Sequence, residues 1–143
     1  MKVIYESRGG STKKLAESMA GALNGVECWD LNAPEGVDIS KIADGELIFL
    51  GSGAYFGSCG AKVKQFIKEL AKNNKKVNLA LFGCSFFKES AAKSMRRCAN
   101  KNGYNPHGYT FSTKGKFLFL FAKRPNSQEL NGAVGFAIRM TKS

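Results

Sequence analysis

The stretch YESRGGSTKKLA, residues 5–16, joins the first apolar run of the chain to a series of helix-forming residues. Gly9 and Gly10 allow a tight backbone turn, and the serine and threonine hydroxyls around them are hydrogen-bond donors. The helix that follows offers unpaired N–H groups and the positive end of its dipole. The stretch therefore predicts a strand-to-helix turn that holds a phosphate, and a simple turn capped by Ser11 is the structural alternative.

The spacing of this turn excludes two common nucleotide-binding loops. It has neither the GxxxxGKS spacing of a nucleoside triphosphate loop nor the GxGxxG spacing of a dinucleotide fold. Neither an ATPase nor a dinucleotide-binding domain is therefore indicated.

Outward from this turn, apolar strands alternate with amphipathic helices. Short apolar runs predict strands at residues 2–6, 26–31, 46–50 and 77–82, and a last strand that starts within residues 109–112. A Gly-rich loop is expected after the third run. Strands that alternate with helices predict right-handed crossovers and a parallel sheet covered on both faces. In such sheets ligands bind beyond the carboxyl ends of the strands.

Helices are predicted between these strands from periodicity and end signals. The first covers residues 11–24, a single turn capped by Asp38 follows, and two amphipathic helices surround residues 63–70 and 91–99, the latter ended by Gly103. In the last helix Asn126 is the expected N-cap and Glu129 its capping-box partner. The expected buried stripe of this helix is Leu130, Ala133, Val134, Ala137 and Ile138.

Length and composition set the class of the protein. A chain of 143 residues with 43% hydrophobic content is expected to form a single domain, residues 1–143. The longest apolar run, residues 117–122, is too short to span a membrane, and no signal peptide is evident, so a cytoplasmic location is expected. The four cysteines have no CxxC spacing and His107 is the only histidine, so free thiols and no metal site are expected.

Charge is distributed unevenly along the chain. Residues 1–46 contain 5 Lys/Arg and 8 Asp/Glu, whereas residues 47–143 contain 17 and 3, and the whole chain carries +11. Such a surface favours encounter with an acidic protein, a nucleic acid or an anionic membrane face, with solubility alone as the alternative. Nucleic-acid binding is not expected, because no groove-reading motif or stacking platform accompanies the charge.

Three loops at the ends of predicted strands carry the candidate site: SRGGST, GSGAYFGSCG and GCSFF. The second and third place small residues beside aromatic pairs, Tyr55 with Phe56 and Phe86 with Phe87, between which a flat ring could stack. One aromatic of each pair is expected to be core instead. A phosphate at the first loop and a planar ring at the other two indicate a mononucleotide with a large ring system, and FMN is the natural candidate.

These loops resemble those of small flavodoxin-like proteins, whose first loop is similar to YSRTGNTKKLA. The similarity includes Ser7, Arg8, Gly10 and Thr12, and extends over LIFLGSGAYFG and over GKF and RPN before the final helix. The resemblance implies a three-layer α/β sandwich with a five-stranded parallel sheet in the order 2-1-3-4-5. It assigns FMN binding to Ser7, Arg8, Gly9, Gly10, Ser11, Thr12, Ser52, Gly53, Ala54, Tyr55, Phe56, Gly57, Cys84, Ser85, Phe86 and Phe87.

The resemblance also implies a function. No loop side chain is a dedicated acid, base or nucleophile, so an FMN protein that passes electrons to a protein partner is expected, acting as a monomer with no catalytic residue of its own. Electron-carrying flavodoxins are usually acidic, so the basic balance here predicts an acidic partner and a less negative second reduction potential.

Two other functions remain open at this stage. One is an FMN-dependent enzyme, such as a quinone reductase or a flavodoxin-type protoporphyrinogen oxidase, which exposure of Phe117, Phe119 and Phe121 would favour. The apolar run around them would then face a membrane surface or a hydrophobic substrate. The other is a flavin-free module that binds a partner.

Overall fold

The computed structural model describes residues 1–143 except 25, 56, 86–89, 114–124 and 143. Strands and helices alternate in the described part, as predicted. The elements in chain order are β1 (Lys2–Glu6), α1 (Ser11–Ala22), β2 (Glu27–Asp30), the 3₁₀ turn η1 (Ile39–Lys41), β3 (Leu47–Tyr55), β4 (Ser58–Cys59), α2 (Ala61–Lys72), β5 (Asn78–Cys84), α3 (Ser90–Lys101), β6 (Phe111–Thr113) and α4 (Ser127–Thr141).

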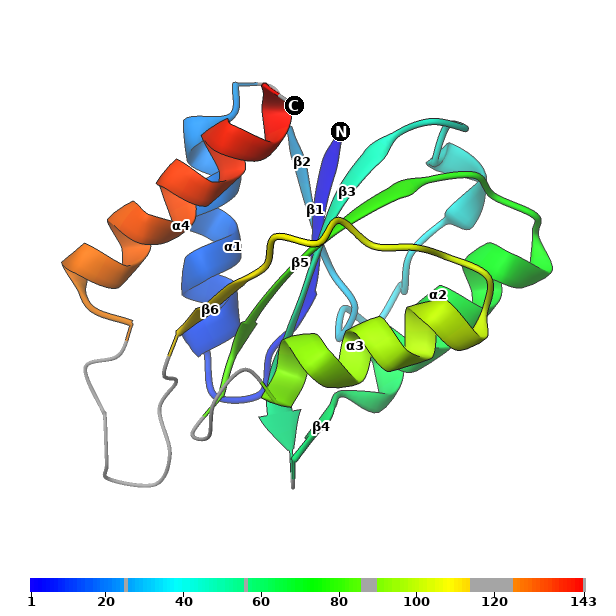
Figure 1. Cartoon of the computed structure of the whole chain (residues 1–143), viewed down its shortest axis with the longest axis horizontal. Coiled ribbons are helices and arrows are strands. Elements are labelled where there is room, and N and C mark those ends of the chain that lie inside the picture. Colours follow the sequence, from blue (N-terminus) through cyan, green and yellow to red (C-terminus); the bar gives the residue numbers. More distant parts are fainter. Residues whose placement is uncertain (25, 56, 86–89, 114–124, 143) are drawn as a thin grey trace.

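The strands form one sheet in the order β2-β1-β3-β5-β6, and every neighbouring pair along this path is parallel (Figure 1). The predicted order 2-1-3-4-5 describes the same path. The numbering shifts because β4, a two-residue strand, pairs antiparallel with the end of β3. The α/β fold class predicted from alternation is confirmed.

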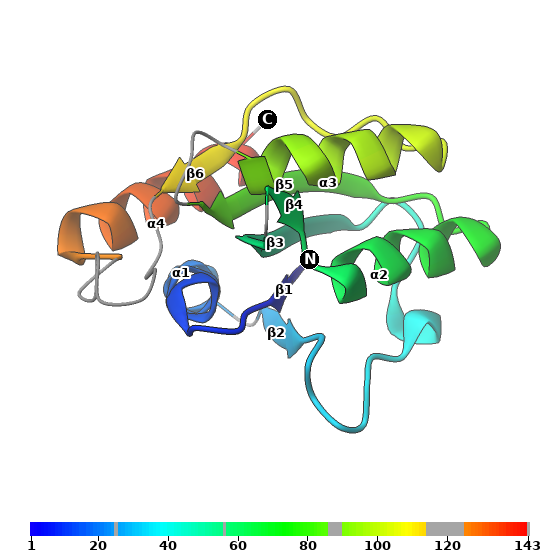
Figure 2. The ribbon, with the colours of Figure 1, turned by 90° about the horizontal axis from the view of Figure 1, so that it is seen from below.

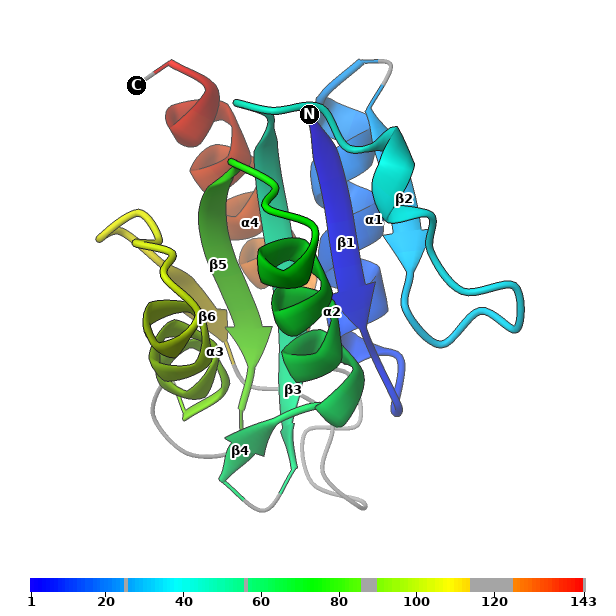
Figure 3. The ribbon, with the colours of Figure 1, turned by 90° about the vertical axis from the view of Figure 1, so that its right-hand side faces the viewer.

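Helices cover both faces of the sheet. Helices α1 and α4 pack on one face and α2 and α3 on the other, which Figures 2 and 3 show from two directions. Successive residues of the central strands point to opposite faces, so Val3 and Phe49 pack under α1 and α4, whereas Ile4 and Leu50 pack under α2 and α3. All four side chains have no exposed surface. The continuous apolar runs thus mark strands buried on both sides.

Strand β3 is longer than the sequence predicts. The prediction ended it at Leu50 and made the following glycine-rich residues a loop, but the strand continues to Tyr55 and returns as β4 through a turn that contains Gly57 at φ 78°. Gly51 lies within the strand, and Phe82, its neighbour on β5, lays its ring against the glycine. A β-carbon at residue 51 would overlap three carbons of that ring. The glycine therefore serves packing in a strand rather than turning in a loop.

Helix α4 keeps its predicted start, and its buried face agrees with the predicted stripe only in part. Asn126 accepts from the Glu129 N–H at 2.9 Å and Glu129 accepts from the Asn126 N–H at 3.0 Å, which confirms the capping box. Ala133 and Ala137 are buried as predicted, and Leu130 is partly buried against the same core. Phe136 and Met140 are buried as well, whereas Ile138, which the prediction placed in the buried stripe, is 39% exposed. Phe136 packs edge-on against Phe49, with the ring centroids 6.0 Å apart. This contact rotates the helix relative to the predicted stripe.

Glu46 ties the amino end of β1 to the start of β3. Its carboxylate accepts from the N-terminal ammonium at 2.7 Å, from Lys2 Nζ at 2.8 Å and from the Ala43 N–H at 3.0 Å. Burial alone would raise the pKa of Glu46, but the hydrogen bonds from Lys2, the N-terminal ammonium and Ala43 lower it to about 2. The ionised carboxylate therefore stabilises the folded state.

Glu46→Gln is expected to lower the free energy of unfolding by about 1–2 kcal/mol at pH 7. Because the folded-state pKa of Glu46 is lowered from 4.5 to about 2, its contribution is present above pH 4.5 and is lost as the pH falls toward 2. Urea unfolding of both proteins at neutral pH and near pH 2 measures the difference. An equal loss at the two pH values would contradict the role given to this carboxylate.

Candidate functional site

The turn between β1 and α1 has the backbone geometry of an anion site. Gly10 adopts φ 92°, and α1 starts after it without a side-chain cap, unlike the fully capped α4. Gly10 N–H donates to Ser7 Oγ at 3.1 Å. Within the described part of the chain, no hydrogen bond uses the N–H groups of Gly9, Thr12 or Lys13. The turn thus presents several unused donors at the positive end of a helix dipole.

Two of the hydroxyl side chains of this turn, those of Ser11 and Thr12, face the protein interior. Ser11 and Thr12 are buried, and the Thr12 hydroxyl bonds to the Cys84 thiol on β5. Burial raises the pKa of Cys84 to about 12, and the Thr12 hydrogen bond opposes this only partly. Cys84 is therefore an unreactive thiol beneath the turn, and the Thr12 N–H rather than its hydroxyl is free to bind an anion.

Arg8 and Tyr55 bring two of the predicted loops together. The Arg8 guanidinium carbon lies 3.9 Å from the centre of the Tyr55 ring, and the Arg8 N–H donates to the Tyr55 hydroxyl at 3.1 Å. Burial raises the pKa of Tyr55 and the nearby Glu6 charge adds to this, whereas the Arg8 N–H acts in the opposite direction. Gly53 leaves room for the tyrosine, because a β-carbon there would lie 3.0 Å from its hydroxyl. An aromatic ring therefore stands beside the anion turn.

Two predicted contact residues have internal roles. Ser52 has no exposed surface, and its hydroxyl donates to the Gly53 carbonyl at 2.7 Å and accepts from the Gly60 N–H at 2.9 Å. Ser85 accepts from the Ala91 N–H at 3.1 Å, so it caps the start of α3. Both serines hold the segments that surround the site in place.

Of the remaining predicted residues, some lie in the hairpin formed by β3 and β4, and the others are not among the residues that the structure describes. Ala54 is half-buried and pairs with Cys59, and Gly57 is exposed at the tip of the β3–β4 hairpin. The candidate stacking residues Phe56, Phe86 and Phe87 lie outside the described residues, as do Phe117, Phe119 and Phe121.

Glu6 is a buried carboxylate to which the sequence assigned no role. It is 3% exposed, and its Oε1 accepts from the Val63 N–H, at the third position of α2, at 3.0 Å. The N-cap of α2 is Gly60, which has no side chain to cap the helix, and Glu6 supplies the acceptor from the neighbouring strand. The sequence contains one signal for this role, because the N-cap position of α2 is not a Ser, Thr, Asp or Asn and the helix therefore needs an acceptor from another segment.

Glu6→Ala is expected to lower the free energy of unfolding by about 2 kcal/mol, since the buried Val63 N–H would lose its acceptor and α2 its charge complement. Glu6→Gln retains an acceptor oxygen, so its free energy of unfolding is expected to fall by less than half as much as that of Glu6→Ala. Urea unfolding at neutral pH measures both. If the two variants were as stable as the parent, Glu6 would not be the cap of α2.

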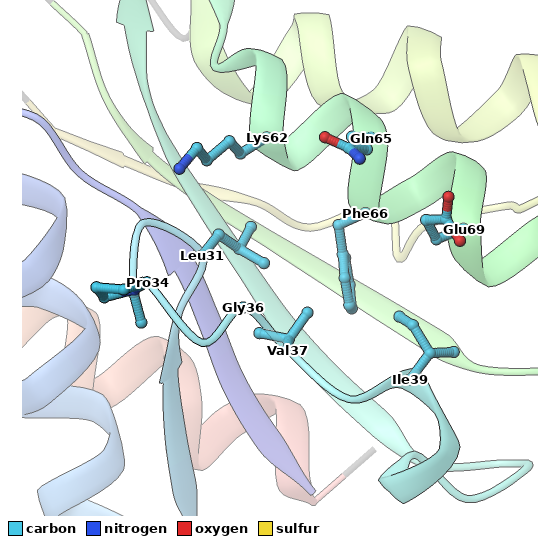
Figure 4. Close-up of a pocket in the computed structure, with 10 residues that line it drawn as sticks. Leu31, Pro34, Gly36, Val37, Ile39, Lys62, Gln65, Phe66 and Glu69 are labelled. Atoms are coloured by element: carbon cyan, nitrogen blue, oxygen red, sulfur yellow. The ribbon is translucent and has the colours of Figure 1, made fainter.

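A hollow lies between α2 and residues 31–39 (Figure 4). Its volume is about 430 Å³, and the side chains of Leu31, Val37, Ile39 and Phe66 line it together with polar groups of α2 such as Lys62. Asn32 Nδ2 donates to the Ser7 carbonyl at 3.0 Å, so the wall of this hollow is joined to the turn. The sequence did not indicate it, because its walls come from segments that are thin in recognisable motifs.

No group of three or more His, Cys, Asp or Glu side chains in the described part of the chain is placed to hold a metal ion. None of the described helices has the length and apolar character needed to cross a membrane.

The chain belongs to the flavodoxin domain family, whose model matches residues 2–119. It is 27% identical to an uncharacterized protein of Methanocaldococcus jannaschii, over 99% of this chain and 97% of the relative. Among solved structures, a flavodoxin from the domain Archaea has a TM-score of 0.77 at 19% identity and covers 99% of this chain and 97% of that one. A Fusobacterium nucleatum flavodoxin bound to flavin mononucleotide has a TM-score of 0.67 at 13% identity, with coverage of 99% and 96%.

Proposed function

We propose that this protein binds FMN and carries electrons to a protein partner. The observation that carries this proposal is the turn at residues 7–13, where unused N–H donors at an uncapped helix start lie next to the Tyr55 ring. A ligand with a phosphate monoester and a planar aromatic ring system matches this arrangement. The phosphate can accept hydrogen bonds from the N–H donors, and the ring system can stack on Tyr55. Solved flavodoxins of the same fold, one of them bound to FMN, support the choice of cofactor.

The residues of the turn would hold the phosphate. Gly9, Thr12 and Lys13 offer backbone N–H groups, the Ser7 hydroxyl lies within the turn, and the Arg8 guanidinium supplies positive charge beside Tyr55. The donor set is neutral N–H groups plus one fixed cation, which fits a dianionic phosphate.

The surroundings of the site favour a carrier over an enzyme. FMN supplies one- and two-electron chemistry by itself, and the protein contributes position and electrostatics. Among the described residues near the turn, Cys84 has a pKa of about 12, the pKa of Tyr55 is raised, and Glu6 is engaged with α2. These groups are poorly suited to exchange protons with a substrate at neutral pH.

Absorbance spectroscopy tests the proposal. The purified protein is mixed with FMN, desalted and compared with free FMN. A retained flavin with shifted peaks, which is reduced by dithionite and reoxidised by a protein acceptor, is the expected result. Loss of all flavin on desalting would remove the redox function and leave a module that binds a partner. Turnover of NAD(P)H with a quinone well above that of free FMN would instead support an enzyme.

The second reduction potential of the FMN-loaded protein is expected to be less negative than in acidic flavodoxins. A cation about 10 Å from the reduced flavin stabilises it by roughly 0.4–1.7 kcal/mol, depending on the effective dielectric. For a one-electron step this is about 20–70 mV for each such charge. Potentiometric titration measures it, and a potential as low as that of acidic flavodoxins would contradict the expectation.

A further inference from the structure

Helices α2 and α3 lie side by side on one face of the sheet (Figure 2). Both helices are rich in lysine and arginine. Their cations are Lys62, Lys64, Lys68, Lys72, Lys93, Arg96, Arg97 and Lys101, and Glu69 is the only carboxylate within the two helices. We call this surface the α2–α3 face. Helices α1 and α4, on the opposite side of the sheet, have a nearly balanced charge.

No carboxylate among the described residues forms an ion pair with a cation of the α2–α3 face. The two ion pairs between described residues join Glu46 to the N-terminal ammonium and to Lys2, beside the start of β1. Neither pair includes a cation of the α2–α3 face. Arg96 donates to the carbonyls of Pro106 and His107, which fixes the guanidinium but leaves its charge uncompensated. Like charges kept close together without counter-charges destabilise the fold, so a binding role would explain their accumulation.

Four of the eleven acidic residues gather at another place. Glu27, Asp30, Glu35 and Asp38 line a hollow along β2, the edge strand of the sheet, with Lys41 as the only cation among its lining residues. Among the described residues, charge is therefore separated between a negative edge at β2 and a positive α2–α3 face. This distribution would turn the positive face toward an anionic partner during approach.

The α2–α3 face adjoins the candidate site. Both helices begin at the carboxyl edge of the sheet, near the anion turn (Figure 3). Lys64 Nζ donates to Ser58 Oγ at 2.7 Å, so one cation of the face contacts the β3–β4 hairpin that also presents Tyr55. A partner bound to the near end of the face would stand next to the site.

The chemistry of the α2–α3 face favours an acidic protein as its partner. The large hydrophobic side chains that are exposed in the described residues are Met1, Tyr109 and Ile138, and none lies on α2 or α3. The face therefore lacks the apolar groups that insert into a lipid surface and the aromatic platforms that stack on unpaired bases. Because it is polar and positive, the face matches the carboxylate-rich surface of a folded protein.

We propose that the α2–α3 face is the docking surface for an acidic redox protein. The redox part of this assignment rests on the proposed function, because the partner exchanges electrons with the FMN at the adjoining site. The docking part rests on the location of the charge, and it can be measured without flavin.

Paired charge reversals test the α2–α3 face. One variant carries Lys68→Glu and Arg97→Glu on the face, and the matched control carries Lys41→Glu and Lys142→Glu at exposed positions elsewhere. Both change the net charge equally. Their dissociation constants are measured for an acidic ferredoxin, a DNA duplex and phosphatidylserine vesicles, with and without FMN, at low and at physiological ionic strength. Urea unfolding verifies that both variants fold.

The expected result is salt-sensitive binding of ferredoxin that is weakened about tenfold in the face variant and by less than about twofold in the control. Equal weakening in both variants, no binding of ferredoxin, or tighter binding of DNA or vesicles through the same face would each overturn the assignment. Docking of ferredoxin through the face by a protein that retains no FMN would support the docking surface and contradict the proposed redox function. The two failures are thereby distinguished.

Discussion

Gly51→Ala is expected to lower the free energy of unfolding by about 3 kcal/mol, because overpacking a filled core forces side chains and backbone to shift. The new methyl group would overlap the Phe82 ring, which is itself fully buried between β5 and the neighbouring helices. Neither strand can move away, since β3 and β5 are hydrogen-bonded along seven residue pairs. Urea unfolding at neutral pH measures the loss.

A double-mutant cycle separates this overlap from other effects of the substitution. Phe82→Leu alone is expected to destabilise the core by removing ring contacts. In the double variant Gly51→Ala with Phe82→Leu, the smaller side chain leaves room for the methyl group, so the double variant should be more stable than the sum of the single losses. Simple additivity would show that the ring of Phe82 is not what excludes a side chain at residue 51.

Gly10→Ala is expected to weaken FMN binding by at least about tenfold while costing only about 1–2 kcal/mol of stability. A β-carbon at residue 10 would meet no atom within 4 Å, so the cost arises from the backbone at φ 92° and not from a clash. Relief of that strain would redirect the N–H groups of Gly9, Thr12 and Lys13, which are proposed to hold the phosphate. Fluorescence titration of FMN measures the affinity.

Gly103→Ala provides the matched control. Gly103 follows α3 at φ 86°, also with no atom within 4 Å of its missing β-carbon, and it lies at the opposite edge of the sheet. The two substitutions should therefore cost similar stability, and only Gly10→Ala should affect FMN. If both variants bound FMN like the parent, the phosphate would not be held by this turn.

The order of elements could be predicted from the sequence because the three central strands β1, β3 and β5 contain short continuous apolar runs and amphipathic helices separate the strands. The capping box of α4 was also predictable, since Asn126 and Glu129 are three residues apart and act on each other. The 3₁₀ turn after Asp38 is a local signal of the same kind, with Ser40 N–H donating to the Asp38 carboxylate at 3.0 Å. Interactions between residues close in sequence are thus the ones that a sequence pattern reveals.

The features that the sequence did not predict depend on contacts between distant segments. The contact between Gly51 and the Phe82 ring joins β3 to β5, and the capping of α2 by Glu6 joins residues 57 positions apart. Two stripes with helical spacing are available on α4, and the contact of Phe136 with Phe49 decides between them. None of these partners can be identified from local spacing.

In the candidate site, too, the sequence predicted the local features and missed the contacts between distant segments. The glycines and hydroxyls of residues 7–12 predicted an anion turn, and the structure forms it with Gly10 in the left-handed region. The pairing of Arg8 with Tyr55 could not be predicted, because it joins loops 47 residues apart. That pairing places an aromatic ring and a fixed positive charge at one side of the turn.

Comparison of FMN with riboflavin by fluorescence titration is the most direct test of an FMN site built on this turn. The two ligands share the ring system and differ in the phosphate, so their affinity ratio reports what the turn contributes. Binding of FMN at least about 100-fold tighter than riboflavin, equivalent to about 2.7 kcal/mol, is the predicted result. Equal affinity for the two ligands, or binding of neither, would contradict it.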